Sequence, residues 1–155
     1  MPAKRLSEGL AEVYSTFQIN GNQASLGGPK QEALEYLHRF PTVSVSELFA
    51  SSGQLAHADK TARDAAFYAQ SWLLTHYLML GSPARKAQYP EFVKRLRSGI
   101  EPATAFRGAF KVDFTSMETE VAKYLAKGIF EPARFDCNQL MSEGGLRVLH
   151  SCSVY

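Results

Sequence analysis

Cysteine is scarce in this sequence, and blocks of like charge are short. The two cysteines, Cys137 and Cys152, are too few for a disulfide framework or a cysteine-based zinc site, although one bridge between them stays open. Seventeen Lys and Arg residues against fifteen Asp and Glu residues give a formal net charge of +2. Phosphate binding needs a basic face several charges strong, so we expect no nucleic-acid partner.

No apolar run is long enough to cross a membrane. The most apolar stretch, residues 65–80, falls short of the roughly 20 apolar residues that a span needs and contains Gln70 and His76. We therefore expect no transmembrane segment. The first twelve residues are charged and lack the apolar core of a signal peptide. The compartment stays open.

What the sequence does have is an ordinary globular composition. It is 155 residues long, 45% hydrophobic and 21% charged, with ten Phe and seven Tyr residues to fill an interior. This length predicts one compact domain or one fragment of a larger fold.

Hydrophobic periodicity predicts a mainly α fold with one small N-terminal β-hairpin. The hairpin is expected around Asn20-Gly21, between strands Phe17–Ile19 and Gln23–Leu26. The expected helices cover residues 3–16, 29–39, 65–80, 84–98 (with a possible bend at Pro90) and 102–110, with a short one after Ser44 and a last one from Thr115 to Gly128. Residues 51–60 read as a surface loop, and residues 129–155 as a tail of uncertain structure.

Two sites have the spacing of a capping box, in which a Ser or Thr side chain and a Glu three positions later close the start of a helix. They are Ser44 with Glu47 and Thr115 with Glu118. Both predict the first residue of a helix.

Three short motifs occur in order along the chain: LSEGLAE at residues 6–12, FYAQSW at 67–72 and AFRGAF at 105–110. Together they resemble the C-terminal portion of gluzincin zinc metallopeptidase domains, in particular the peptidase-MA-like domains of uncharacterised bacterial proteins that often carry tetratricopeptide repeats. The resemblance covers residues 3–128. It implies a helical C-terminal subdomain of a peptidase that cleaves peptide or protein substrates with metal-activated water.

The resemblance also implies roles for two carboxylates. Glu8 matches the third zinc ligand, and Glu12, one helical turn on, matches the residue that orients a zinc-bound histidine. The alternative is that both are solvated surface residues that pair with Lys4 and Arg5.

The motif H-E-x-x-H, which supplies two zinc ligands and the general base in this family, is missing. None of His38, His57, His76 and His150 has another histidine at helical spacing. Either Met1 is not the true start of the domain or the chain is a degenerate remnant. We expect the chain as given to be inactive and to hold zinc weakly.

Three residues near the second motif are candidates for stabilising a transition-state oxyanion: Tyr68, His76 and Tyr77. A lone histidine on an apolar helix is more often a core residue. The competing hypothesis is a non-catalytic module in which the helices of residues 62–127 bind a partner peptide. A fragment would also leave apolar surface around Leu6, Leu10 and the central helix, which predicts self-association.

Overall fold

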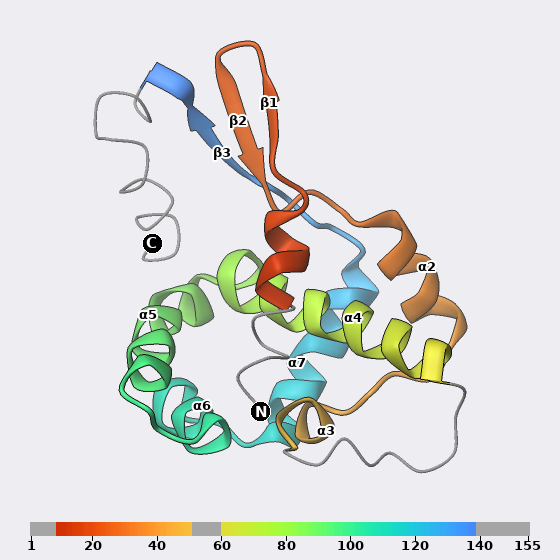
Figure 1. Ribbon diagram of the computed structural model, residues 1–155, viewed down its shortest axis with the longest axis vertical. Helices are drawn as coiled ribbons and strands as arrows, with labels where there is room; N and C mark the ends of the chain where they lie inside the picture. The colour runs from red at the N-terminus through yellow and green to blue at the C-terminus, as the bar shows by residue number, and fades with distance from the viewer. Residues whose placement is uncertain (1–8, 51–59, 139–155) are drawn as a thin grey trace.

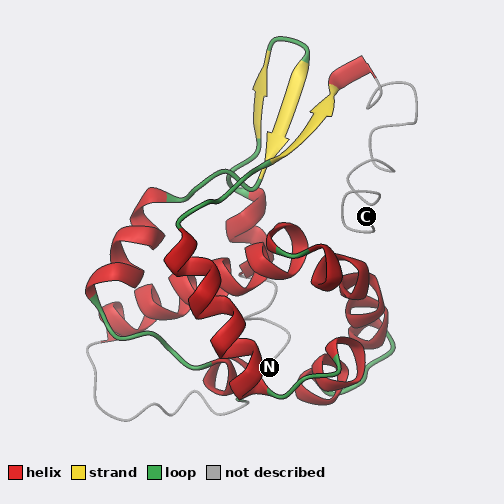
Figure 2. Ribbon diagram, turned by 180° about the vertical axis from the view of Figure 1, so that it is seen from behind, coloured by secondary structure: helices red, strands yellow, loops and turns green. Residues whose placement is uncertain are grey.

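The structure is a computed structural model that describes residues 9–50 and 60–138. Its helices gather into one body, and three short strands project from one end of it (Figures 1 and 2). A helix covers residues 9–14. The elements that follow are β1 (Gln18–Asn20), β2 (Gln23–Leu26), α2 (Gln31–Arg39), α3 (Val45–Phe49), α4 (Lys60–His76), the π-helical turn η1 (Tyr77–Gly81), α5 (Pro83–Arg97), α6 (Pro102–Phe110), α7 (Phe114–Lys127) and β3 (Ala133–Asp136). The predicted mainly α fold with its hairpin is confirmed.

The sheet has one strand more than the predicted hairpin. Strands β1 and β2 pair antiparallel with Asn20 opposite Gln23, and Gly21 makes the turn at a φ of 61°. Strand β3 pairs with the other edge of β2 and places Phe135 opposite Ala24. Residues 129–155 were expected to be a tail without clear structure, but their first part belongs to the fold.

One capping box is confirmed and the other is wrong. The Ser44 hydroxyl accepts a hydrogen bond from Glu47 N, and the Glu47 carboxylate accepts one from Ser44 N. At α7 the cap is Asp113, whose carboxylate accepts from the amide of Ser116 at 2.7 Å. Glu118 instead accepts from the amide of Val45 at 2.8 Å and so ties the start of α3 to α7.

The expected signals are confirmed at the starts of α5 and α6 and at the end of α7, but not at two other helices. Helix α2 begins at Gln31, so Pro29 lies before the helix and not in its first turn. Helix α4 begins at Lys60, earlier than the predicted residue 65, and gives way to the π-helical turn η1 at Tyr77. Pro83 and Pro102 stand in the first turns of α5 and α6, and Gly128 ends α7 at a φ of 65°. Helix α5 continues through Pro90. The loop predicted for residues 51–60 lies outside the described residues except for Lys60, where α4 begins.

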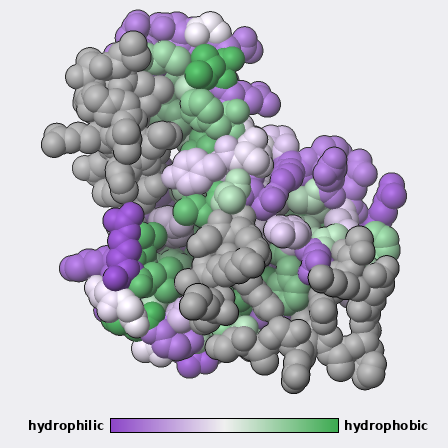
Figure 3. Space-filling view, in the orientation of Figure 1, coloured by the Kyte–Doolittle hydropathy of each residue, from purple (hydrophilic) through white to green (hydrophobic). Residues whose placement is uncertain are grey.

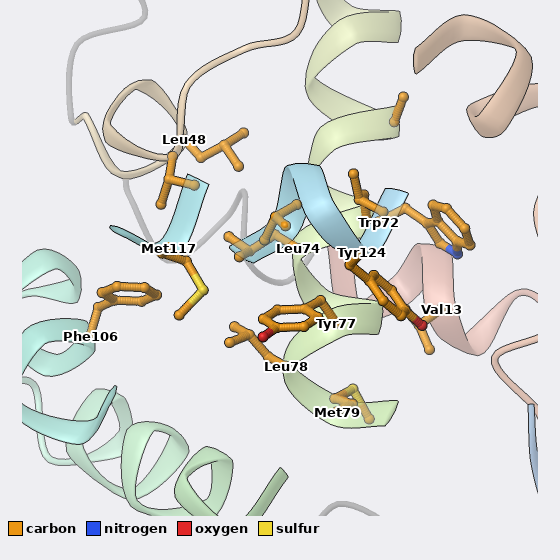
Figure 4. Packing of buried hydrophobic residues seen from close by; sticks show 14 of the residues in the cluster. Val13, Leu48, Trp72, Leu74, Tyr77, Leu78, Met79, Phe106, Met117 and Tyr124 are labelled. Carbon is orange, nitrogen blue, oxygen red and sulfur yellow. The ribbon is translucent and has the colours of Figure 1, made fainter. Parts of the chain in front are cut away.

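Aromatic rings fill two adjoining parts of the core. Phe49, Phe92 and Phe106 pack edge-on or tilted against one another between α3, α5 and α6, with ring centroids 5.0 to 6.4 Å apart. The rings of Tyr77 and Tyr124 lie 5.1 Å apart and point into the core from η1 and α7 (Figure 4). Packing among rings of this kind fixes the positions of the helices around α4.

Most of the apolar side chains of the central helix are buried, although Tyr68 is 44% exposed. Trp72, Leu73 and Leu74 are at most 1% exposed, and Leu10 packs partly buried against the core. Leu6, which we expected on the same face, lies outside the described residues, so the predicted self-association stays a prediction. Isolated apolar side chains are exposed elsewhere, among them Ile19 at 66%, and Figure 3 shows hydrophobic surface below the hydrophilic tip of the sheet.

Two other expectations meet the structure only in part. No helix within the described parts of the chain has the length and apolar character needed to cross a membrane. Cys137 is partly buried just after β3, and Cys152 lies outside the described residues, so their pairing stays a prediction.

Candidate functional site

The first and second sequence motifs meet in space. The helix of residues 9–14 packs against α4 at Gly9, where a Cβ atom would lie 2.6 Å from Thr75 Oγ1 and 2.7 Å from the carbonyl oxygen of Ser71. Only glycine allows so close an approach. Val13, one turn further along, is fully buried. Two segments about 60 positions apart in the sequence thus form one wall of the molecule.

The side chain of Glu12 points away from the contact at Gly9 and toward solvent. Its carboxylate pairs with the ammonium group of Lys30, which lies just before α2, and the Glu12 side chain is 23% exposed. The partners suggested by the sequence, Lys4 and Arg5, lie outside the described residues. The partner that the structure gives Glu12 comes from the segment after the hairpin.

A cleft of about 400 Å³ opens beside this ion pair, and we call it the α4 cleft. Its walls come from the helix of residues 9–14, from α2 and from α4. They are Glu12, Lys30, Glu32, Ala33, Tyr36, Ala65, Tyr68 and Ala69. Glu12 and Tyr68, two of the residues singled out from the sequence, therefore line the same cleft.

Tyr68 is the accessible candidate among the three proposed for an oxyanion. It is 44% exposed, and its hydroxyl has no hydrogen-bond partner within the described residues. The other tyrosine of the cleft, Tyr36, donates its hydroxyl hydrogen to the carbonyl oxygen of Ala62 at 3.1 Å. An exposed phenol hydroxyl in a cleft can donate a hydrogen bond to a bound group.

His76 lies elsewhere, fully buried at the end of α4. Its Nε2 is 2.6 Å from the carbonyl oxygen of Gly27, and its Nδ1 is 2.8 Å from the hydroxyl of Tyr124. A carbonyl only accepts, so Nε2 carries the ring proton and Tyr124 donates to Nδ1. Burial lowers the pKa of His76, against an opposing effect of the Gly27 hydrogen bond. The ring is therefore neutral and fully partnered.

Tyr77 is part of a separate hydrogen-bond network that joins η1, α5 and α7. Its hydroxyl donates to Glu120 Oε2 at 2.9 Å, and Arg85 binds both oxygens of the same carboxylate. The hydrogen bond from Arg85 is the largest cause that lowers the pKa of Glu120, while burial raises the pKa of Tyr77. Arg85 also donates to the carbonyl oxygen of Phe110 at 2.9 Å, so the network fastens α6 as well.

Glu8, the proposed third zinc ligand, lies outside the described residues. Within residues 9–50 and 60–138, no three His, Cys, Asp or Glu side chains gather closely enough to hold a metal ion. Glu12, the one carboxylate of LSEGLAE within the described residues, is already neutralised by Lys30. The described residues alone do not make a zinc site.

Sequence reasoning missed the partners that define each place. Lys30 and Tyr124 belong to none of the sequence motifs. Arg85 and Glu120 are 35 positions apart, so no local pattern indicates that they pair. A polar residue inside an apolar helix, such as His76, was the one available signal that a buried partner must exist.

Comparison with known proteins adds no relative, because no family model, no curated protein and no solved structure matches the chain. The function has to be inferred from the motifs and from the geometry of the α4 cleft.

Proposed function

We propose that residues 3–128 are the C-terminal portion of a gluzincin-like zinc metallopeptidase domain. In this proposal Glu8 is the third zinc ligand, Glu12 orients the site, and Tyr68 is the side chain that can donate to a substrate carbonyl. His76 and Tyr77 take structural parts, because each is already partnered inside the protein. Hydrolysis requires the H-E-x-x-H helix, so the 155 residues by themselves are inactive.

The observation that carries the proposal is the meeting of the two motifs at Gly9. The resemblance rests on three motifs, and two of them, LSEGLAE and FYAQSW, are distant in sequence and have no periodic relation to each other. A chance match gives no reason for them to touch. Gly9 contacts Ser71 and Thr75 directly, and Glu12 faces the same cleft as Tyr68.

The fit to zinc is incomplete. A catalytic gluzincin site needs two histidines and one carboxylate, with a fourth position open for water. None of the described residues that line the α4 cleft is a histidine. We therefore derive no catalytic step through zinc, and the part proposed for this chain is to hold Glu8, Glu12 and Tyr68 at one wall of a complete site.

The test begins with the coding sequence. We expect an in-frame H-E-x-x-H about 20 residues before Glu8 when the DNA upstream of the Met1 codon is translated. In that longer chain, Glu8→Ala should weaken zinc binding about 100-fold or more in competition with a chromophoric chelator, and Glu12→Gln about 10-fold. The control is Glu91→Ala, because Glu91 pairs with Arg95 on the surface of α5, away from the α4 cleft.

A stop codon or an unrelated sequence upstream would overturn the proposal. So would equal zinc affinity in the wild type and Glu8→Ala. The chain would then be a non-catalytic helical module, and the search would turn to its binding partners.

A further inference from the structure

Strand β3 forms one edge of the three-stranded sheet. The strand order is β1-β2-β3, so within the described residues β3 is paired with a strand on one side only. Figures 1 and 2 show it along one side of the sheet that projects from the helices. A strand in this position presents backbone N–H and C=O groups with which a strand of another molecule can pair.

The register determines which residues of β3 present these groups. The backbone N–H of Cys137 donates to the carbonyl oxygen of Asn22 at 2.9 Å, and these two residues continue the register of β2 with β3. In an antiparallel pair, successive residues alternate between exchanging hydrogen bonds with the neighbouring strand and turning these groups away from it. Phe135 therefore bonds to β2, whereas Arg134 and Asp136 turn their backbone groups to the free edge.

The opposite edge of the sheet, on β1, offers fewer groups. Ala24 lies opposite Phe135 and turns its backbone groups to β3, so Ile19, which lies opposite Ala24 on the other side, has no hydrogen-bonding partner in β2. Ile19 is thus the one residue of β1 that presents its backbone groups at the outer edge. Because β3 presents two such residues, we expect its edge to pair more readily.

The same two residues of β3 carry opposite charges. Arg134 and Asp136 are both exposed and lie on one face of the sheet, because they are two positions apart. Arg134 makes no ion pair within the described residues, although Glu32 lines the same pocket. Asp136 accepts hydrogen bonds from the Asn22 side chain and from the N–H of Asn138, both through Oδ1. Its Oδ2 is left for a cation.

The edge of β3 is therefore complementary to itself. When a second copy of β3 runs antiparallel to the first, with Phe135 opposite Phe135, Arg134 of each copy lies opposite Asp136 of the other. The backbone groups that point to the free edge then bond to each other, and opposite charges meet directly across the two strands. The Phe135 side chains, partly buried against the core, meet on the other face, where the residue pair without hydrogen bonds brings side chains closest.

We propose that two copies of this chain dimerise by antiparallel pairing of β3 with β3 in this register, so that their sheets join into one. The proposal does not rest on the peptidase function, and it uses a different surface from the face around Leu6 and Leu10. So short an edge makes a small interface, and we expect a dissociation constant of about 10 to 100 µM. Charges on an edge strand discourage pairing with other strands, and here their order favours an identical one.

The experiment is sedimentation velocity of the whole chain at about 5 to 500 µM, with a reducing agent that prevents a disulfide at Cys137. Arg134→Glu and Asp136→Lys each place like charges in both symmetric pairs, so each variant alone should dimerise about tenfold more weakly than the wild type. An equimolar mixture of the two variants restores opposite charges at both pairs and should recover the wild-type affinity within about threefold. The control is Arg97→Glu, which makes the same change of charge at an exposed position on α5 and should have no effect.

Three results would overturn the proposal: a monomer at every concentration, a dimer that Arg97→Glu weakens as much as Arg134→Glu does, or two weakened variants whose mixture does not recover. Circular dichroism shows whether each variant keeps its fold. Arg134→Pro is an independent test, because it removes an N–H that β2 does not use, and proline is tolerated at such an edge position. A dimer that persists in this variant would equally contradict the pairing.

Discussion

Helix α4 carries two polar residues, Tyr68 and His76, that looked alike as candidates in the sequence but occupy opposite environments. Tyr68 is 44% exposed in a cleft, whereas His76 is fully buried between Gly27 and Tyr124. A buried group whose partners are all inside the protein contributes to stability, and an accessible group without a partner is available to a ligand. Whether a side chain stabilises the fold or can bind a ligand depends more on its neighbours than on its residue type.

The largest effect expected from this comparison is on stability. His76→Leu fills the space but leaves the Gly27 carbonyl and the Tyr124 hydroxyl buried without a partner, so it should cost about 3 kcal/mol in the free energy of unfolding. Tyr68→Phe removes a hydroxyl that has no partner among the described residues and should change that free energy by less than about 0.5 kcal/mol. Urea denaturation measures both. Equal effects of the two substitutions would break the comparison.

The contact that brings Glu12 and Tyr68 to one cleft can be tested at its closest point. Gly9→Ala forces a methyl group against the backbone of Ser71 and should lower the free energy of unfolding by about 2 kcal/mol. Gly28→Ala is the control, because nothing lies within 4 Å of the added Cβ atom. If Gly9→Ala were neutral or stabilising, the packing of the first helix on α4 would be looser than described.

A smaller effect should appear with pH. The pKa of His76 is lowered from an ordinary value of 6.5 in the folded state, so the unfolded chain takes up the proton first as the pH falls. Stability is therefore complete above about pH 6.5 and declines below it, by at most about 1 kcal/mol between pH 6.5 and 5.5 for this one group. NMR titration of the ring in the wild type, and the loss of this pH dependence in His76→Gln, measure the effect. A His76 pKa above 6.5 would contradict it.

The helical framework could be predicted because its signals are local. Ser44 with Glu47 caps α3, Pro102 opens α6, and Gly128 ends α7 within a few residues of where the sequence placed them. The prediction of a capping box at Thr115 and Glu118 was wrong, because the capping-box rule considers only the spacing of residues along the chain. The rule cannot register that Asp113 competes for the cap and that Glu118 has a better partner at Val45.

The candidate site was predictable only as separate pieces. The motifs pointed to Glu12 and Tyr68, but nothing in their spacing showed that they share a cleft or that Lys30 pairs with Glu12. The same limit applies to β3, a strand of four residues whose partner lies near the other end of the chain. Contacts between distant segments depend on the whole fold and leave little local pattern.

The late third strand has a consequence for how the molecule is assembled during synthesis. Asn22 and Asp136, which meet beside the paired strands β2 and β3, are 114 positions apart, so the hairpin leaves the ribosome long before its outer partner exists. Helices can form early because their hydrogen bonds join residues that are close in the sequence. Strand β3 can pair with β2 only when the long chain segment between them has brought its two ends together. Until then β2 presents an unpaired edge. The pairing of β2 with β3 can therefore form only after the rest of the described chain has been synthesised, and it joins the two ends of the described fold.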